Sequence, residues 1–203
     1  MEDRIEQLTR LFLKFPGIGA RQAKRFAHFI LSEQESYVKN LAATLVSARN
    51  QAHTCSLCFK IFESLPAQAG NPGICHICRD EKRDKQTIAV VEKSSDIDAF
   101  SKTDYNGLFF VLGSLIPIVQ KNIIDKTRAK ELIQRIEKEG SEINEIILAF
   151  PLTPNGDHTD SVIRDLISKY TINVSSLGRG LSVGTELEYA DPASLEASLK
   201  KRE

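Results

Sequence analysis

The sequence predicts an α+β multidomain protein, and three observations support this fold class. Apolar residues recur at helical spacing through the N-terminal region, four cysteines lie in one short stretch, and the second half alternates short apolar runs with helical segments. Such alternation indicates an α/β region with a mainly parallel sheet covered by helices. A strand and a helix are expected to form the C-terminal tail. We therefore expect four segments, at residues 1–53, 54–80, 86–181 and 182–203.

Composition excludes several classes of protein. Of the 203 residues, 41% are hydrophobic and 27% charged, which is typical of a globular protein and not of a disordered one. No apolar run approaches the ~20 residues that cross a bilayer, and the N-terminus is charged from Glu2 onward. Neither membrane insertion nor a secretory leader is expected. The 27 basic and 27 acidic residues are unevenly divided, because residues 1–85 hold 13 of the basic and 9 of the acidic ones.

Three helices are predicted in the N-terminal region. The first covers residues 3–15 and the second residues 21–31, with Pro-Gly-Ile-Gly between them. The second helix is expected to bury an apolar stripe made of Ala23, Phe26, Ala27, Ile30 and Leu31. The third is expected to bury Val38, Leu41, Ala42 and Leu45.

The break at residues 16–19 gives the first two helices a helix-hairpin-helix pattern. Glycine lets such a hairpin approach a DNA backbone closely, and the free N–H groups at the start of the second helix point at a phosphate oxygen. No acidic residue lies between Glu6 and Glu33, and the candidate DNA-binding residues are Gly17, Gly19, Arg21, Lys24 and Arg25. Binding of this kind is independent of sequence and sensitive to salt. A solvated basic helix face is the alternative interpretation.

The four cysteines have the spacing of metal ligands. They form two Cys-x2-Cys units, Cys55 with Cys58 and Cys75 with Cys78, separated by 16 residues. Each unit lets one tight turn present two sulfurs, and two turns complete the tetrahedron of a structural zinc site. A redox pair or unrelated buried cysteines are the alternatives. We expect one structural Zn²⁺, with His53 and His76 outside its ligand set because four thiolates saturate the ion.

The second half is predicted to contain four strands, at residues 87–92, 108–112, 143–150 and 172–177. Helices are expected near residues 95–102, 126–139 and 159–170. The tail is expected to add a strand at 185–189 and a helix from Pro192. No G-x-x-x-x-G-K-[ST] motif occurs, so nucleotide binding through a phosphate loop is not supported.

Two acidic residues follow predicted strands, where ligands of parallel sheets usually bind. Glu92 ends the first strand, and Asp157 lies in an acidic loop after the third. Carboxylates so placed suit Mg²⁺, which retains several waters in protein sites. Capping of helix N-termini is the alternative role for both acids.

Taken in order, these features resemble the RecR family of bacterial recombination mediator proteins over essentially the whole chain. The family's helix-hairpin-helix is matched by LFLKFPGIGARQAKRFAHFIL, and its zinc finger by the four cysteines. Its Toprim domain is similar to TIAVVEKSSDIDAF at the start and to EIILAFPLTPNGDHTDSVI at the acidic loop. Its glycine-rich C-terminal stretch resembles GRGLSVGTELEYAD.

The resemblance implies a non-enzymatic DNA-repair protein of the bacterial cytoplasm, associated with the nucleoid. RecR proteins bind single-stranded, gapped or duplex DNA without sequence preference, assemble into dimers or a ring-like tetramer, and partner RecO and RecF. Together these proteins help load RecA onto single strands. Arg21 and Arg25 match the DNA-contacting positions of the family hairpin, whereas Glu92 and Asp157 match acidic Toprim positions in a region of RecO contact.

Two departures from the family pattern bear on the site. The cysteine pairs are farther apart than is usual, and the insert is assigned to Leu65–Gly73. The acidic loop reads Asn155-Gly156-Asp157 where the family has Glu first, which weakens the expectation of Mg²⁺ unless Asp160 compensates. A metal-dependent Toprim nuclease or primase is therefore the rival function, since two-metal chemistry needs several acids. A zinc-ribbon adaptor that binds no DNA is the third.

Overall fold

A computed structural model describes residues 3–63, 73–119 and 127–178, together with residues 181, 184, 186–190 and 192–200. The chain forms two compact units, Met1–Ala52 and His53–Glu203. Most of the expected insert at Leu65–Gly73 lies outside the described residues. None of the helices that are described is long and apolar enough to cross a membrane.

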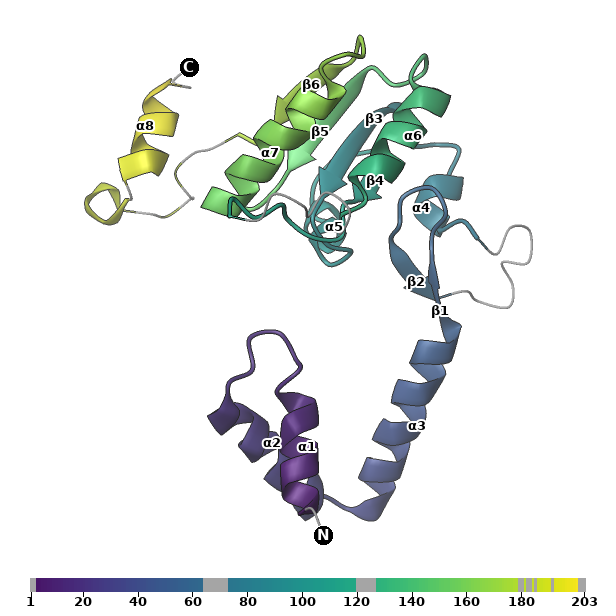
Figure 1. The fold of residues 1–203 in the computed structure, drawn as a ribbon, viewed down its shortest axis with the longest axis vertical. Coiled ribbons are helices and arrows are strands. Elements are labelled where there is room, and N and C mark those ends of the chain that lie inside the picture. Colours follow the sequence, from purple (N-terminus) through teal and green to yellow (C-terminus); the bar gives the residue numbers. More distant parts are fainter. Residues whose placement is uncertain are drawn as a thin grey trace. The chain divides into compact units, whose positions relative to one another are not determined.

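The first unit consists of three helices, as expected: α1 (Arg4–Phe12), α2 (Ala20–Ser32) and α3 (Glu35–Gln51) (Figure 1). The carboxylate of Asp3 caps α1 by accepting the N–H of Ile5 at 3.1 Å, which satisfies a donor that the helix leaves free. Helices α1 and α2 pack together, and Ala23 and Ala27 of α2 are fully buried. Small side chains at these two positions allow the close approach of the helices.

Part of the expected burial in this unit is wrong. Leu31 of α2 is 53% exposed, and α3 buries none of its residues, with Leu45 62% exposed. Helical periodicity identifies an apolar face, but it does not say whether the same chain covers that face. Here α1 and α2 cover each other, and the apolar side chains of α3 stay at the surface of the single chain.

The second unit contains a four-stranded parallel sheet made of β3 (Asp84–Val91), β4 (Gly107–Val111), β5 (Glu145–Ala149) and β6 (Asn173–Ser176). The strand order is β4-β3-β5-β6, and every pairing is parallel. The expected α/β region is thus confirmed. Its helices are α5 (Asp96–Phe100), α6 (Ala129–Glu139) and α7 (Pro154–Ile167). Helix α7 begins earlier than expected, because Thr153 caps it and Pro154 opens it.

Alternate residues of the strands face two separate hydrophobic cores. On one face, Ile88, Val90 and Phe110 pack with residues of α6 and α7. On the other face, Ala89, Val91 and Phe109 pack with α5 and with the cysteine segment. That segment is built from the short strands β1 (Ala52–Thr54) and β2 (Ile61–Glu63) and the one-turn helix α4 (His76–Arg79). It therefore takes the place that a helix has in many α/β folds.

The C-terminal tail differs from the sequence expectation in one element. The described part of the expected strand at 185–189 is a 3₁₀ turn at Leu187–Tyr189, in which the N–H of Tyr189 donates to the carbonyl of Glu186 at 3.0 Å. This local bond satisfies the backbone without a partner strand. The expected helix is confirmed as α8 (Pro192–Lys200).

Thr159 of α7 connects the loop after β4 to α7, and its replacement tests that connection. Its buried hydroxyl donates to the carbonyl of Asn155 at 2.6 Å and accepts the N–H of Ile116 at 2.8 Å. We expect Thr159→Val to lower the free energy of unfolding by about 1–3 kcal/mol, because the N–H of Ile116 is left buried and unpaired. Thr159→Ser keeps the hydroxyl and should lose less. Denaturant unfolding of both variants measures this, and equal stability of the valine variant and the wild-type protein would contradict it.

Candidate functional site

The four cysteines converge at one point in the second unit. The Sγ atoms of Cys55, Cys58, Cys75 and Cys78 all lie within 4.8 Å of one another. The first three residues are fully buried, and the Sγ atoms of Cys58 and Cys75 are 3.6 Å apart. Two turns of the chain, one before β2 and one leading into α4, bring the pairs together.

This arrangement fits a tetrahedral zinc ion. Zn–S bonds of ~2.3 Å place tetrahedral sulfurs ~3.8 Å apart, close to the separation of Cys58 and Cys75. The backbone N–H of Cys75 donates to the Sγ of Cys55 at 3.4 Å, and such bonds stabilise thiolates. Within the described residues, no other group of three or more His, Cys, Asp or Glu side chains has this geometry. His53 and His76 are outside the cluster, as expected.

Charge also favours a bound cation at this point. Hydrogen bonding among the neighbouring thiols, together with burial, raises the pKa of Cys58 and of Cys78 far above the ordinary range of a thiol. Four thiolates therefore cannot coexist here without a compensating positive charge. A metal ion supplies that charge and displaces the protons when it binds.

The hairpin between α1 and α2 has the backbone that the sequence pattern requires. Gly17 has a φ of 76°, in the left-handed region that favours glycine. Gly19 occupies the N-cap of α2 in an extended conformation and provides no side-chain cap. Arg21, Lys24 and Arg25 are all exposed. The five candidate DNA-binding residues thus lie in one turn and the first two turns of one helix.

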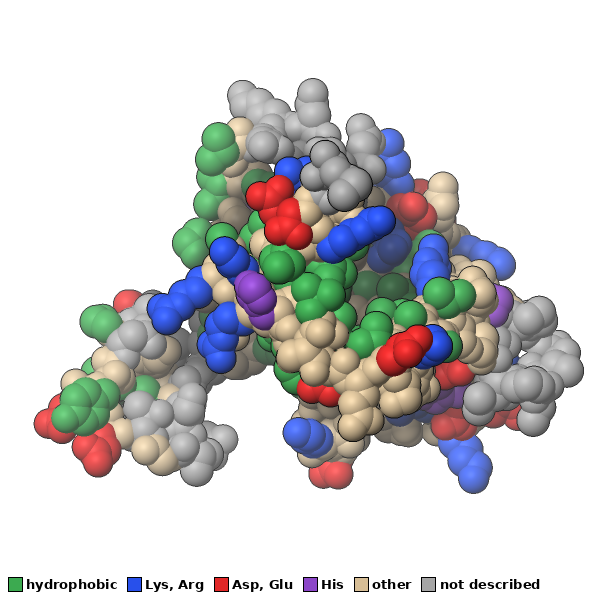
Figure 2. Space-filling view, turned by 90° about the horizontal axis from the view of Figure 1, so that it is seen from below, with side chains coloured by type: hydrophobic (Ala, Val, Ile, Leu, Met, Phe, Trp, Pro, Cys, Tyr) green, Lys and Arg blue, Asp and Glu red, His purple; other side chains and the backbone are tan. Residues whose placement is uncertain are grey.

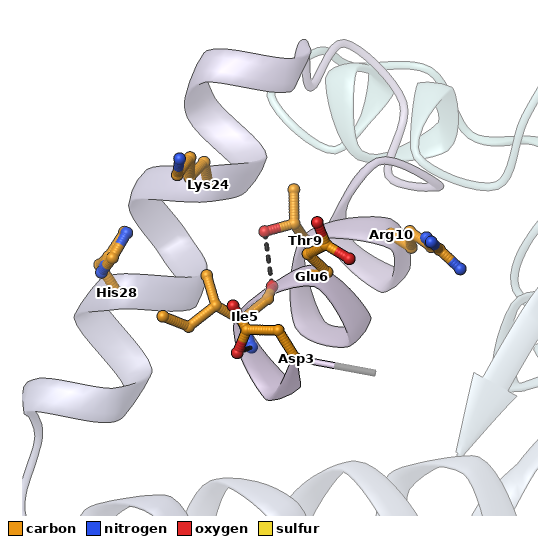
Figure 3. A pocket seen from close by; sticks show the side chains of 7 residues that line it. All are labelled: Asp3, Ile5, Glu6, Thr9, Arg10, Lys24 and His28. Carbon is orange, nitrogen blue, oxygen red and sulfur yellow. Dashed lines mark hydrogen bonds between the residues drawn. The ribbon is translucent and has the colours of Figure 1, made fainter. Parts of the chain in front are cut away.

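A hollow of about 430 Å³ lies between α1 and α2, beside this basic face. Lys24 and His28 line it from α2, whereas Asp3 and Glu6 line it from the α1 side, with Ile5 between them (Figure 3). The hollow is therefore of mixed charge. Sequence reasoning did not place these two acids beside Lys24, because the acid-free stretch begins only after Glu6.

The sheet register brings the two candidate acids to the same edge of the sheet. Val91 of β3 pairs with Ala149 of β5, so Glu92 and the loop leading to Asp157 follow neighbouring strand ends. Glu92 is largely buried and pairs with Lys93 at 3.1 Å. Asp157 is exposed in the first turn of α7, where a negative charge stabilises the helix.

Asp160 does not join these acids as a further metal ligand. Its carboxylate pairs with Arg164 at 3.4 Å and accepts the hydroxyl of Ser176 on β6. Arg164 in turn donates to the carbonyl of Val174 at 2.6 Å. Asp160 thus attaches α7 to β6.

Comparison with known proteins extends over the whole chain. Residues 5–49 match the family description "RecR, helix-hairpin-helix", residues 86–178 match "Toprim domain", and residues 180–203 match "RecR, C-terminal". A protein named "Recombination protein RecR" from Chloroherpeton thalassium is 38% identical over 98% of this chain and 95% of its own. Proteins of the same name from Lactobacillus johnsonii and Streptococcus mutans are 34% and 35% identical, each over 98% of this chain and 96% of its own.

The chain belongs to the RecR family of recombination proteins. This membership supports a role in recombinational repair. The RecR hairpin match covers α1, α2 and almost all of α3, and the Toprim match begins within β3 and ends just after β6. The four cysteines lie between these two matches.

One buried charge of this RecR protein has little signal in the sequence. Arg135 of α6 is 7% exposed and contacts the cysteine segment. Its position within α6 looks like that of any surface arginine in an amphipathic helix. The salt bridge to Glu139 one turn later is the pattern that marks it, and i, i+4 pairs of this kind are common on exposed helices.

We expect Cys55→Ser to reduce the metal content from one ion per chain toward none and to lower the free energy of unfolding by several kcal/mol, because metal binding contributes folding free energy. His76→Ala is the matched control, since His76 neighbours Cys75 but lies outside the cluster. Metal content by elemental analysis, with thermal unfolding, measures both. Unchanged metal content in the serine variant would rule out the four-thiolate site.

Proposed function

We propose that this RecR family member is a non-enzymatic clamp and scaffold that binds DNA without sequence preference. It acts in the bacterial cytoplasm at the nucleoid, and with RecO and RecF it helps load RecA onto single-stranded DNA. A structural Zn²⁺ holds its cysteine segment. The observation that carries the proposal is the hairpin: a glycine turn and an uncapped helix start stand beside three exposed basic residues in a chain that matches RecR over its whole length.

The hairpin suits phosphate because its donors are unengaged by side-chain caps and its charges are accessible. The N-cap Gly19 leaves the first N–H groups of α2 without a side-chain acceptor, and such groups bind anions. Arg25 donates to the Oε1 of Gln22 at 3.2 Å, which holds its guanidinium along the helix. Contacts to phosphate carry no base information. Binding is therefore independent of sequence.

Exposed apolar residues support self-association into a dimer or a tetramer ring. The first unit leaves several large apolar side chains at its surface, among them Leu11, Phe15, Leu31, Leu45 and Val46, and Figure 2 shows hydrophobic side chains lying at the surface. Contiguous apolar surface on a small unit marks a protein–protein contact. A ring retains DNA by encircling it, so it needs no base contacts.

The acidic edge of the sheet is assigned to partner docking, with RecO as the partner. Asp157 is accessible, whereas Glu92 is paired with Lys93 and Asp160 with Arg164. Among the described residues, the acids at this edge do not come together as a group of three metal-ligating side chains, and Mg²⁺ is therefore not part of the proposal. A Toprim nuclease or primase is the second candidate, favoured by the Toprim match alone. Metal-dependent phosphoryl chemistry needs more acids than these.

Replacing Arg21 and Arg25 together with Ala should weaken DNA binding for every sequence tested. The slope of log affinity against log salt should fall by about 2, because each lost phosphate contact removes about one unit. Fluorescence anisotropy on labelled single strands over a salt series measures this. Lys102→Ala with Lys138→Ala removes equal charge outside the hairpin and should leave the slope unchanged. An unaltered slope in the hairpin variant would refute its role in DNA binding.

Glu92→Gln separates docking from catalysis. Wild-type protein incubated with labelled gapped circular DNA and Mg²⁺ should shift the DNA on a native gel and leave its strands intact on a denaturing gel. The variant should bind DNA equally well but lose association with RecO, since a neutral amide no longer complements a basic partner. Cut or extended strands that disappear in the variant would establish the enzymatic alternative instead.

A further inference from the structure

Arg135 is the buried charge of the second unit. Its guanidinium forms three contacts: Nε pairs with Glu139 at 3.0 Å, and Nη1 donates to the carbonyls of Leu57 at 3.2 Å and Phe109 at 3.1 Å. A buried charge destabilises a protein unless it is paired and hydrogen-bonded. These contacts provide the compensation, and two of them reach outside α6 to other parts of the fold.

The two carbonyls belong to elements that are distant in sequence. Leu57 lies inside the turn from Cys55 to Cys58, and Phe109 lies on β4, the edge strand of the sheet. A second bond runs alongside, because the N–H of Val111 on β4 donates to the carbonyl of Cys58 at 2.8 Å. The first cysteine turn and the open edge of β4 are therefore joined by one main-chain bond and one arginine.

We propose that Arg135 is a positioning residue of the metal site. By holding the carbonyl of Leu57, it fixes the peptide orientation of the turn so that the sulfurs of Cys55 and Cys58 converge. The same side chain transmits the metal's stabilisation to β4. Partners just outside a metal's ligands orient those ligands, and their loss typically weakens metal binding by 10–100-fold. The inference rests on the four-cysteine site and is independent of DNA binding.

The geometry of the arginine side chain matters for this role. A guanidinium has several donors in a fixed plane, so it contacts the turn, the strand and Glu139 at once. A lysine ammonium at the same position keeps the charge but not the planar fork. The conservative substitution therefore separates the effect of charge from that of geometry.

A neighbouring residue supplies the control. Lys138 lines the same hollow between α6 and the cysteine turn as Leu57 and Arg135, but it is exposed. Replacing Lys138 changes the charge of this surface without removing a contact to the turn. Any effect specific to Arg135 must then come from its hydrogen bonds.

The test measures zinc affinity of the full chain by competition with a chromophoric chelator. Arg135→Met should weaken zinc binding by roughly 10–100-fold, Arg135→Lys should weaken it less, and Lys138→Met should leave it within about twofold. Zinc affinity of Arg135→Met equal to that of wild type would overturn the proposal. If the methionine variant does not fold, the lysine variant decides, and unchanged zinc affinity there has the same consequence.

A double-mutant cycle excludes a merely structural role. In the Cys55→Ser background, which lacks the metal site, Arg135→Met should shift the denaturant midpoint less than it does in wild type, because part of its effect acts through the metal. Equal shifts in the two backgrounds would mean that Arg135 only stabilises the fold, and the positioning role would be rejected. Failure of the hairpin variants to lose DNA affinity would leave this result untouched.

Discussion

Attachment of the cysteine segment to the sheet is the interaction on which the second unit depends. Helices α6 and α7 cover one face of the sheet, but the opposite face meets α5, which has only five residues, and the segment that holds Cys55 to Cys78. That segment has almost no regular structure of its own. Its order comes from four sulfurs around one point, so a single ion does for this face what a long amphipathic helix does for the other.

The two units divide structural demands differently. The second unit buries a continuous core on both faces of its sheet, whereas the first buries little beyond the contact of α1 with α2 and leaves α3 exposed. A unit with so much apolar surface gains stability from association. Its folding and its assembly are therefore linked, while the sheet and its metal-held cover form a self-sufficient body.

Sequence reasoning succeeded where one local pattern determines the outcome. The paired Cys-x2-Cys units predicted the cluster, glycines predicted the hairpin turn, and apolar runs predicted the parallel strands β3 to β6. It failed where the outcome depends on distant partners. The exposure of Leu31 and Leu45, the pairing of Asp160 with Arg164 and the burial of Arg135 each depend on which surfaces meet in three dimensions. The tail near Tyr189 failed for another reason, since a local turn satisfied a backbone that alternation assigned to a strand.

The middle of the acidic loop shows how a motif can keep its shape while its charge changes. A Cβ placed on Gly156 would lie 1.9 Å from the carbonyl oxygen of Pro151, so glycine is required for α7 to begin this close to the end of β5. Asn155 is exposed beside it and meets no such restriction.

A hydrogen bond at the base of the cysteine segment has a consequence for evolution. The N–H of Ser56 donates to the carbonyl of Gly73 at 2.8 Å, which ties the two turns together on the ion's side of the insert. Chain added beyond this tie does not alter the spacing within either cysteine pair. Loop-closure entropy grows only with the logarithm of length, at about 0.6 kcal/mol per doubling. The distance between the pairs is thus a neutral dimension along which lineages can drift, and a place to graft a reporter sequence without disturbing the metal.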